Sequence, residues 1–134
     1  MIGILIIAHA PLASALRDCA LHVFPDCAAG VLALDVLADD APEDSLQQAR
    51  DAMTALATNE VLLLSDVFGA TPCNVVRGLL QPGLVEGIAG VNLPMLIRAL
   101  SYRNEPLRVV VEKAISGGRE GVVHFDQETC ERYE

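Results

Sequence analysis

Short apolar runs alternate with longer amphipathic segments along most of the chain. The runs are short enough to be strands buried in a sheet, and the first of them is rich in β-branched isoleucine. They cover residues 2–8, 31–37, 61–65, 85–90 and 121–125. Between them, apolar residues recur at helical spacing, and several of these segments open with a proline, which suits the first position of a helix. The pattern therefore predicts βαβ units and a parallel sheet.

The helical segments are bounded by prolines, glycines and acidic residues. We expect helices over residues 12–23, from about 42 to 56, from 72 to the Pro82-Gly83 pair, and over 95–102 and 107–115. Thr71 is placed to cap the third of these, and Gly117-Gly118 is expected to end the last. The polar residues from about 126 onward form a tail that is expected to fray. Together the elements predict one domain over residues 1–134, an open, doubly wound, mostly parallel α/β sheet with helices on both faces.

Composition and charge narrow the class of protein. With 134 residues, of which 52% are hydrophobic, the chain can bury a core, which argues against intrinsic disorder. Its net charge of −9 disfavours binding to nucleic acid or to an anionic membrane surface. No apolar run approaches the roughly 20 residues that cross a bilayer, and no basic segment precedes the first run, which predicts a cytoplasmic protein. The four cysteines form no C-x-x-C pair, so buried thiols are expected rather than disulfides or a zinc site.

Candidate chemistry gathers where the predicted strands end. His9 follows the first strand and Asp66 the third, and the segments after them lead into helices whose N-termini suit a phosphoryl group or another anion. Neutral imidazole is a good nucleophile near pH 7, and a carboxylate bonded to one ring nitrogen would leave the other free to attack. From the residues alone, a strand-end histidine bonded to a carbonyl and a turn-capping aspartate remain open alternatives. The Gly69 loop matches neither the P-loop nor the dinucleotide fingerprint, which disfavours a kinase or a dehydrogenase.

Four segments carry a resemblance to a known family. They are Gly3 to His9, Asp66 to Asn74, Ile88 to Leu96 and Gly118 to Gly121. In this order and spacing they resemble the mannose-family enzyme IIA domain of the bacterial sugar phosphotransferase system, over residues 2 to about 125. The family's domain is an α/β sheet whose C-terminal strand crosses to a second subunit. The resemblance therefore implies that the short strand at 121–125 is antiparallel and exchanged in a homodimer.

The resemblance also implies roles for particular residues. His9 would accept a phosphoryl group from the phosphocarrier HPr and pass it to an enzyme IIB, and Asp66 would hydrogen-bond its imidazole. The Thr71 hydroxyl and the backbone N–H groups of Gly69, Ala70 and Thr71 would donate to the phosphoryl oxygens. The intermediate is a covalent phosphohistidine, so no cofactor or metal is implied. Phe68, in the turn after Asp66, is expected to be exposed for docking of HPr or enzyme IIB.

The chain departs from the family pattern beside its candidate site. Ala8 and Ala10 flank His9 where the family usually has Thr and Gly, which removes one hydroxyl and a permissive backbone position. Cys73 stands where an aromatic residue is common, and His22 and His124 lack a matching motif, so we expect both histidines to be structural. An alternative function is that of a regulatory phosphoprotein, in which the phosphorylation state of His9 controls binding to a metabolic enzyme or sensor without sugar transport. A small-molecule-binding module of flavodoxin-like outline is less favoured, because hydroxyl-rich phosphate loops and stacking aromatic residues are lacking.

Overall fold

The computed structural model describes residues 1–132, and its centre is a four-stranded parallel sheet. The strands are β1 (Gly3–His9), β2 (Val31–Val36), β3 (Val61–Ser65) and β4 (Val85–Ala89). They lie in the order β2-β1-β3-β4, and every neighbouring pair is parallel. The chain moves from β1 to β2 on one side and then crosses to β3 on the other, so the strand order reverses between β1 and β3. The predicted open, parallel, doubly wound sheet is confirmed.

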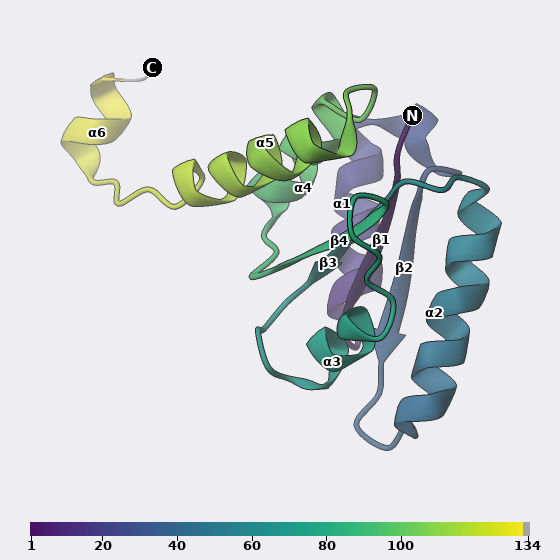
Figure 1. The fold of residues 1–134 in the computed structure, drawn as a ribbon. Helices are drawn as coiled ribbons and strands as arrows, with labels where there is room; N and C mark the ends of the chain where they lie inside the picture. Colours follow the sequence, from purple (N-terminus) through teal and green to yellow (C-terminus); the bar gives the residue numbers. More distant parts are fainter. Residues whose placement is uncertain (133–134) are drawn as a thin grey trace.

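Helices cover both faces of this sheet (Figure 1). They are α1 (Leu12–Val23), α2 (Pro42–Leu56), α3 (Thr71–Arg77), α4 (Leu93–Ser101), α5 (Leu107–Glu120) and α6 (Gln127–Arg132), with a short 3-10 turn, η1 (Pro25–Cys27). The helices α1, α4 and α5 pack on one face, and α2 and α3 pack on the other. No helix among residues 1–132 is both long and apolar enough to cross a membrane.

The central strand β1 is buried on both faces. Ile4, Ile6 and Ala8 belong to the core cluster on the α1, α4 and α5 side, whereas Leu5 and Ile7 belong to the cluster on the α2 and α3 side. All five side chains are fully buried. Because burying an Ile or Leu side chain contributes about 1.5–3 kcal/mol, β1 is a firm support for the residue at its carboxyl end. That residue is His9.

The glycine pair in α5 does not end the helix, contrary to the sequence-based prediction. The helix continues through Gly117 and Gly118 because both face α4 where the two helices pack closely. A Cβ atom on Gly117 would lie 2.6 Å from the Cβ of Arg98. Next to this contact the Asn92 amide caps α4 by accepting from the Met95 N–H at 2.9 Å, and it donates to the Gly118 carbonyl at 3.0 Å. The glycines therefore serve helix packing rather than helix termination.

Two predictions about α3 are also wrong. Thr71 is the first residue of the helix and not its cap, because Ala70 occupies the N-cap position in extended conformation and provides no side-chain hydrogen bond. The helix ends at Arg77 rather than at the Pro82-Gly83 pair. The pair instead lies in the turn before β4, in which Gly83 has a φ of +80°, a left-handed conformation that favours glycine.

The C-terminal segment leaves the compact part of the fold. Residues 121–126 form neither helix nor strand in the single chain, and the side chains of Val122, Val123 and Phe125 are exposed. The tail that we expected to fray forms α6, which lies beyond the end of α5 and has no buried residue (Figure 1). An antiparallel strand at 121–125 is therefore not formed within one chain, and its pairing with a second chain stays a prediction.

The cysteines divide into two groups. Cys27 and Cys73 are buried, as expected, whereas Cys19 and Cys130 are exposed, contrary to the prediction of buried thiols. Cys19 is exposed because it lies on the outer side of α1, and Cys130 because it lies on α6, which packs against no core. All four are free thiols.

Candidate active site

The sheet brings His9 and Asp66 together at its carboxyl edge. His9 is the last residue of β1, Asp66 follows the last residue of β3, and the two strands are neighbours with Ile7 beside Ser65. The ring Nδ1 of His9 lies 2.7 Å from the Asp66 Oδ2 atom. The backbone N–H of His9 donates to the same oxygen at 3.1 Å. One carboxylate therefore holds both the ring and the backbone of the histidine, at the point where the strand order reverses.

The Asp66 side chain is 9% exposed and the His9 side chain is 54% exposed. Burial raises the pKa of the Asp66 carboxyl, but hydrogen bonds from the His9 ring and from the His9 and Val67 amides outweigh burial and hold the pKa below its usual range. Asp66 is therefore ionised at neutral pH. Because a carboxylate can only accept hydrogen bonds, the hydrogen on the His9 ring belongs to Nδ1.

This tautomer determines which ring nitrogen is reactive. With the hydrogen on Nδ1, the lone pair of Nε2 is free, and Nε2 has no hydrogen-bond partner among residues 1–132. Since more than half of the His9 side chain is exposed, a reacting group can approach it from solvent. The pair thus presents an oriented nucleophile, and the nearby negative charge stabilises positive charge that develops on the ring during attack.

The loop between β3 and α3 contains the other predicted phosphoryl-binding residues. Gly69 has a φ of +87°, and the Ala70 N–H closes a turn onto the Val67 carbonyl at 3.3 Å. The N–H groups of Gly69 and Thr71 and the Thr71 hydroxyl donate to no residue of the described chain. Two of the three backbone N–H groups predicted to bind phosphoryl oxygens, those of Gly69 and Thr71, thus have no acceptor within the described chain. The third, that of Ala70, already donates to the Val67 carbonyl.

Thr71 also borders a cavity at this edge. The cavity lies between the beginnings of α2 and α3 and has a volume of about 370 Å³. It is lined by Pro42, Glu43, Leu46, Thr71, Asn74 and Val75.

A smaller cavity, of about 100 Å³, is bordered by Phe68 of the β3–α3 loop and by Ser65. Phe68 is 81% exposed, as predicted for a docking residue. Ser65 is buried, and its hydroxyl has no hydrogen-bond partner in the described chain. The exposed side chains Leu12, Leu37 and Val67 follow the carboxyl ends of β1, β2 and β3, so exposed apolar residues lie at the same edge of the sheet as the histidine.

Two residues near the end of β1, Asp35 and Ser14, were not predicted from the sequence. Asp35 lies in β2, and its carboxylate accepts hydrogen bonds from the backbone and the side chain of Ser14, in the first turn of α1. The sequence does contain a signal that Asp35 has a specific contact, because it is the one charged residue of an otherwise apolar strand. Its partner could not be identified, since the two residues are 21 positions apart in the sequence.

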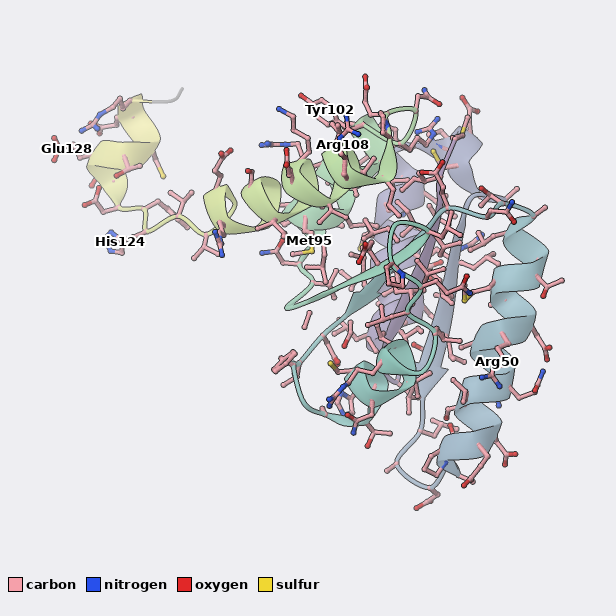
Figure 2. All side chains as sticks on the ribbon, in the orientation of Figure 1. Arg50, Met95, Tyr102, Arg108, His124 and Glu128 are labelled. Atoms are coloured by element: carbon pink, nitrogen blue, oxygen red, sulfur yellow. The ribbon has the colours of Figure 1, made fainter. Side chains whose placement is uncertain are left out.

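The remaining histidines lie away from this pair. His22 is exposed near the end of α1, and His124 lies in the segment between α5 and α6 (Figure 2). Among residues 1–132, no three His, Cys, Asp or Glu side chains are grouped so that they could hold a metal ion.

Comparisons with known proteins identify relatives of this chain. Residues 3–114 match the family model EIIA-man, described as the PTS system fructose IIA component. A curated relative is the PTS system mannose-specific EIIAB component of Escherichia coli K12, which is 40% identical over 68 residues. That match spans 48% of this chain but only 21% of the relative's length.

Solved structures extend the likeness to nearly the whole chain. The phosphotransferase system component EIIA from Streptococcus agalactiae superposes with a TM-score of 0.82 at 27% identity, over 93% of this chain and 98% of that one. The mannose/sorbose-specific IIA subunit from Enterococcus faecalis has a TM-score of 0.78 at 23% identity, covers 92% of this chain and 94% of its own, and shows the fold alone. The family match covers most of the sequence, including both members of the His9–Asp66 pair. The chain therefore belongs to the EIIA-man family of phosphotransferase system IIA components.

Proposed function

We propose that this protein is a phosphocarrier that accepts a phosphoryl group on His9 from phospho-HPr and passes it to an enzyme IIB. The observation that carries the proposal is the hydrogen bond of 2.7 Å between Nδ1 and Asp66, which leaves Nε2 as an exposed nucleophile. The Nε2 lone pair forms a bond to phosphorus while the phosphorus–nitrogen bond in phospho-HPr breaks. In the second transfer the phosphorus–Nε2 bond breaks, and the acceptor residue of enzyme IIB takes the phosphoryl group.

The remaining site residues assist this transfer. Asp66 keeps the hydrogen on Nδ1 and offsets the positive charge that the ring acquires as the bond to phosphorus forms. The amides of Gly69 and Thr71 and the Thr71 hydroxyl donate to phosphoryl oxygens, and the Ala70 amide joins them when its bond to Val67 opens. The proposal uses no cofactor or metal beyond the covalent phosphohistidine. Because HPr and enzyme IIB donate and accept in the cytoplasm, the protein acts there.

Partner binding uses the exposed apolar residues at the same edge of the sheet as the histidine. Phe68 is the most exposed of them and is proposed as the main docking contact. A homodimer completes the proposal: residues 121–125 of one chain add an antiparallel strand to the sheet of a second chain. The exposed Val122, Val123 and Phe125 support this exchange, as does the outer edge of β4, which no other strand of the described residues covers and which pairs only at Val85, with Gln81. Light scattering after size exclusion tests it, and a monomer at micromolar concentration would contradict it.

Phosphotransfer from phosphoenolpyruvate tests the main proposal. The protein is incubated with labelled phosphoenolpyruvate, enzyme I and HPr, and wild type is compared with His9→Ala and with His22→Ala as a matched control. Wild type and His22→Ala should acquire label, whereas His9→Ala should remain unlabelled. Label on His9→Ala would remove His9 from the mechanism. Transfer onward to a purified enzyme IIB supports the phosphocarrier role, and label that stays on His9 in its presence supports the regulatory alternative.

A further inference from the structure

We propose that Asp35 is a positioning residue for phosphoryl transfer at His9, because it caps α1 from the neighbouring strand and so holds the far end of the turn that directly follows His9. This inference rests on His9 being the phosphoacceptor. It concerns a residue pair, Asp35 and Ser14, that lies outside the His9–Asp66 pair and outside the loop after β3.

The first helix lacks a cap of its own. Pro11 occupies its N-cap position, makes no side-chain hydrogen bond, and is followed by no acidic residue in the first turn. A helix N-terminus with free N–H groups is normally satisfied by a Ser, Thr, Asp or Asn side chain directly before it. Here the Asp35 Oδ1 atom accepts from the Ser14 N–H at 3.1 Å, and its Oδ2 atom accepts from the Ser14 hydroxyl. The Asp35 carboxylate, from the strand β2, therefore caps the N-terminus of α1 in place of a residue directly before the helix. Its negative charge also interacts favourably with the positive end of the helix dipole.

Asp35 is placed so that this cap acts on the reactive histidine. In the parallel β1–β2 pair, Asp35 lies beside Ala8, the residue directly before His9. One residue further, the Ala10 N–H donates to the Val36 carbonyl at 3.0 Å. The strand β2 thus holds the chain before His9, after it, and again at Ser14, whereas Asp66 holds His9 from the opposite side. A change of the Asp35 side chain would remove the contact at Ser14, which is one of these three points, and leave the two backbone contacts in place.

The chemistry of Asp35 excludes a more direct part in transfer. Both of its oxygens accept hydrogen bonds from Ser14, and neither contacts His9, so the carboxylate is engaged with the start of α1 rather than with the imidazole. A carboxylate in an apolar strand is costly to bury unless it is hydrogen-bonded, and Ser14 provides both bonds. Asp35 therefore acts through the backbone of the turn, and its removal should change how the imidazole is presented rather than how HPr binds.

Three variants and one matched control test the inference. Asp35→Ala removes both acceptors, Asp35→Asn keeps one, and Ser14→Ala removes only the hydroxyl bond. Asp18→Asn is the control. Asp18 is exposed on α1, the helix that contains Ser14, and its substitution removes one negative charge, as Asp35→Asn does. For each protein we would measure the single-turnover rate of His9 phosphorylation against phospho-HPr concentration, together with the ¹⁵N shifts of the His9 ring, which report its tautomer.

We expect Asp35→Ala to lower the maximal rate by about 3- to 30-fold, less than the about 100-fold that a 1 Å misplacement of reacting groups can cost. The phospho-HPr concentration at half-maximal rate should stay unchanged, and the share of the Nδ1–H tautomer should fall. Asp35→Asn should recover part of the rate, Ser14→Ala should lose less than Asp35→Ala, and Asp18→Asn should match wild type. Ser14→Ala, which loses the fewest contacts, keeps the test valid should Asp35→Ala fold poorly.

A wild-type maximal rate and tautomer in Asp35→Ala or Ser14→Ala, with only a lower melting temperature, would overturn the inference and leave Asp35 as an ordinary helix cap. This outcome differs from failure of the phosphocarrier proposal itself. In that case His9→Ala would still acquire label, whatever the rate of the Asp35 variants.

Discussion

The Asp66→Asn substitution tests whether the buried carboxylate controls the reactivity of His9. Asparagine has the same shape but carries one acceptor and one donor group in place of two acceptors. The wild-type carboxylate accepts from the His9 ring at 2.7 Å, from the His9 amide at 3.1 Å and from the Val67 amide at 2.9 Å. With one acceptor left, either the His9 contacts or the Val67 contact must be lost. Where the amide NH₂ faces the ring, Nδ1 must accept, and the hydrogen moves to Nε2, the attacking nitrogen.

The size of the effect follows from these contacts. A hydrogen bond to a charged group contributes about 1.5–3 kcal/mol, which corresponds to about 10- to 150-fold in rate. Solvent screens part of this interaction, because the His9 side chain is 54% exposed although Asp66 is only 9% exposed. We therefore expect the lower part of the range, a fall of about 10- to 30-fold in the rate of His9 phosphorylation.

Rapid-quench measurement of phosphoryl transfer from phospho-HPr, with urea unfolding of the same samples, provides the assay. Hydrogen bonds hold the pKa of Asp66 below its ordinary value of 3.8, so its ionised form stabilises the fold above that pH, and the contribution declines as the pH falls through the lower folded-state pKa. The stability difference between wild type and Asp66→Asn should therefore be constant near neutral pH and shrink on acidification below 3.8. Unchanged transfer kinetics in a folded Asp66→Asn protein would refute the assigned role of the carboxylate.

Three further predictions concern packing and docking. Ser65→Ala should raise the free energy of unfolding by about 1 kcal/mol, because it removes a buried hydroxyl without a partner; a loss of stability on urea unfolding would show that the hydroxyl is bonded to water. Gly117→Ala should lower the melting temperature despite the better helix propensity of Ala, because its Cβ would lie 2.6 Å from the Cβ of Arg98; an unchanged melting temperature would contradict this. Phe68→Ala should leave stability unchanged, since Phe68 is 81% exposed, and should raise the phospho-HPr concentration at half-maximal rate; equal values would remove Phe68 from docking.

The sheet and the His9–Asp66 pair could be predicted from the sequence because both depend on strong local signals. Buried strands appear as short apolar runs, and parallel strands place their carboxyl ends at one edge, so residues after the first and third strands had to be neighbours once the strand order was known. The hydrogen bond of 2.7 Å between the two side chains agrees with that reasoning.

The features that the sequence did not reveal depend on contacts between distant segments. Gly117 resembles a helix stop in the sequence, but its role follows from the approach of α4, whose Arg98 is 19 residues away. Thr71 resembles a cap, but the extended conformation of Ala70 shifts the helix start by one residue. Asp35 resembles an isolated charge until the fold places it beside the first turn of α1. For Gly117 and Asp35, contacts between distant segments therefore decide a role that the local sequence does not show.

The structure changes the interpretation of Ala8 and Ala10, the two alanines that flank His9. The sequence suggests that Ala8 removes a hydroxyl from the phosphoryl site, yet its side chain is fully buried in the core cluster on the α1 side of the sheet. A hydroxyl at position 8 would therefore point into that core. Ala10 acts through its N–H, which binds the Val36 carbonyl. Both alanines therefore join β1 to β2 through their backbone on either side of His9, and Asp35 adds a side-chain contact to β2 further along, at Ser14.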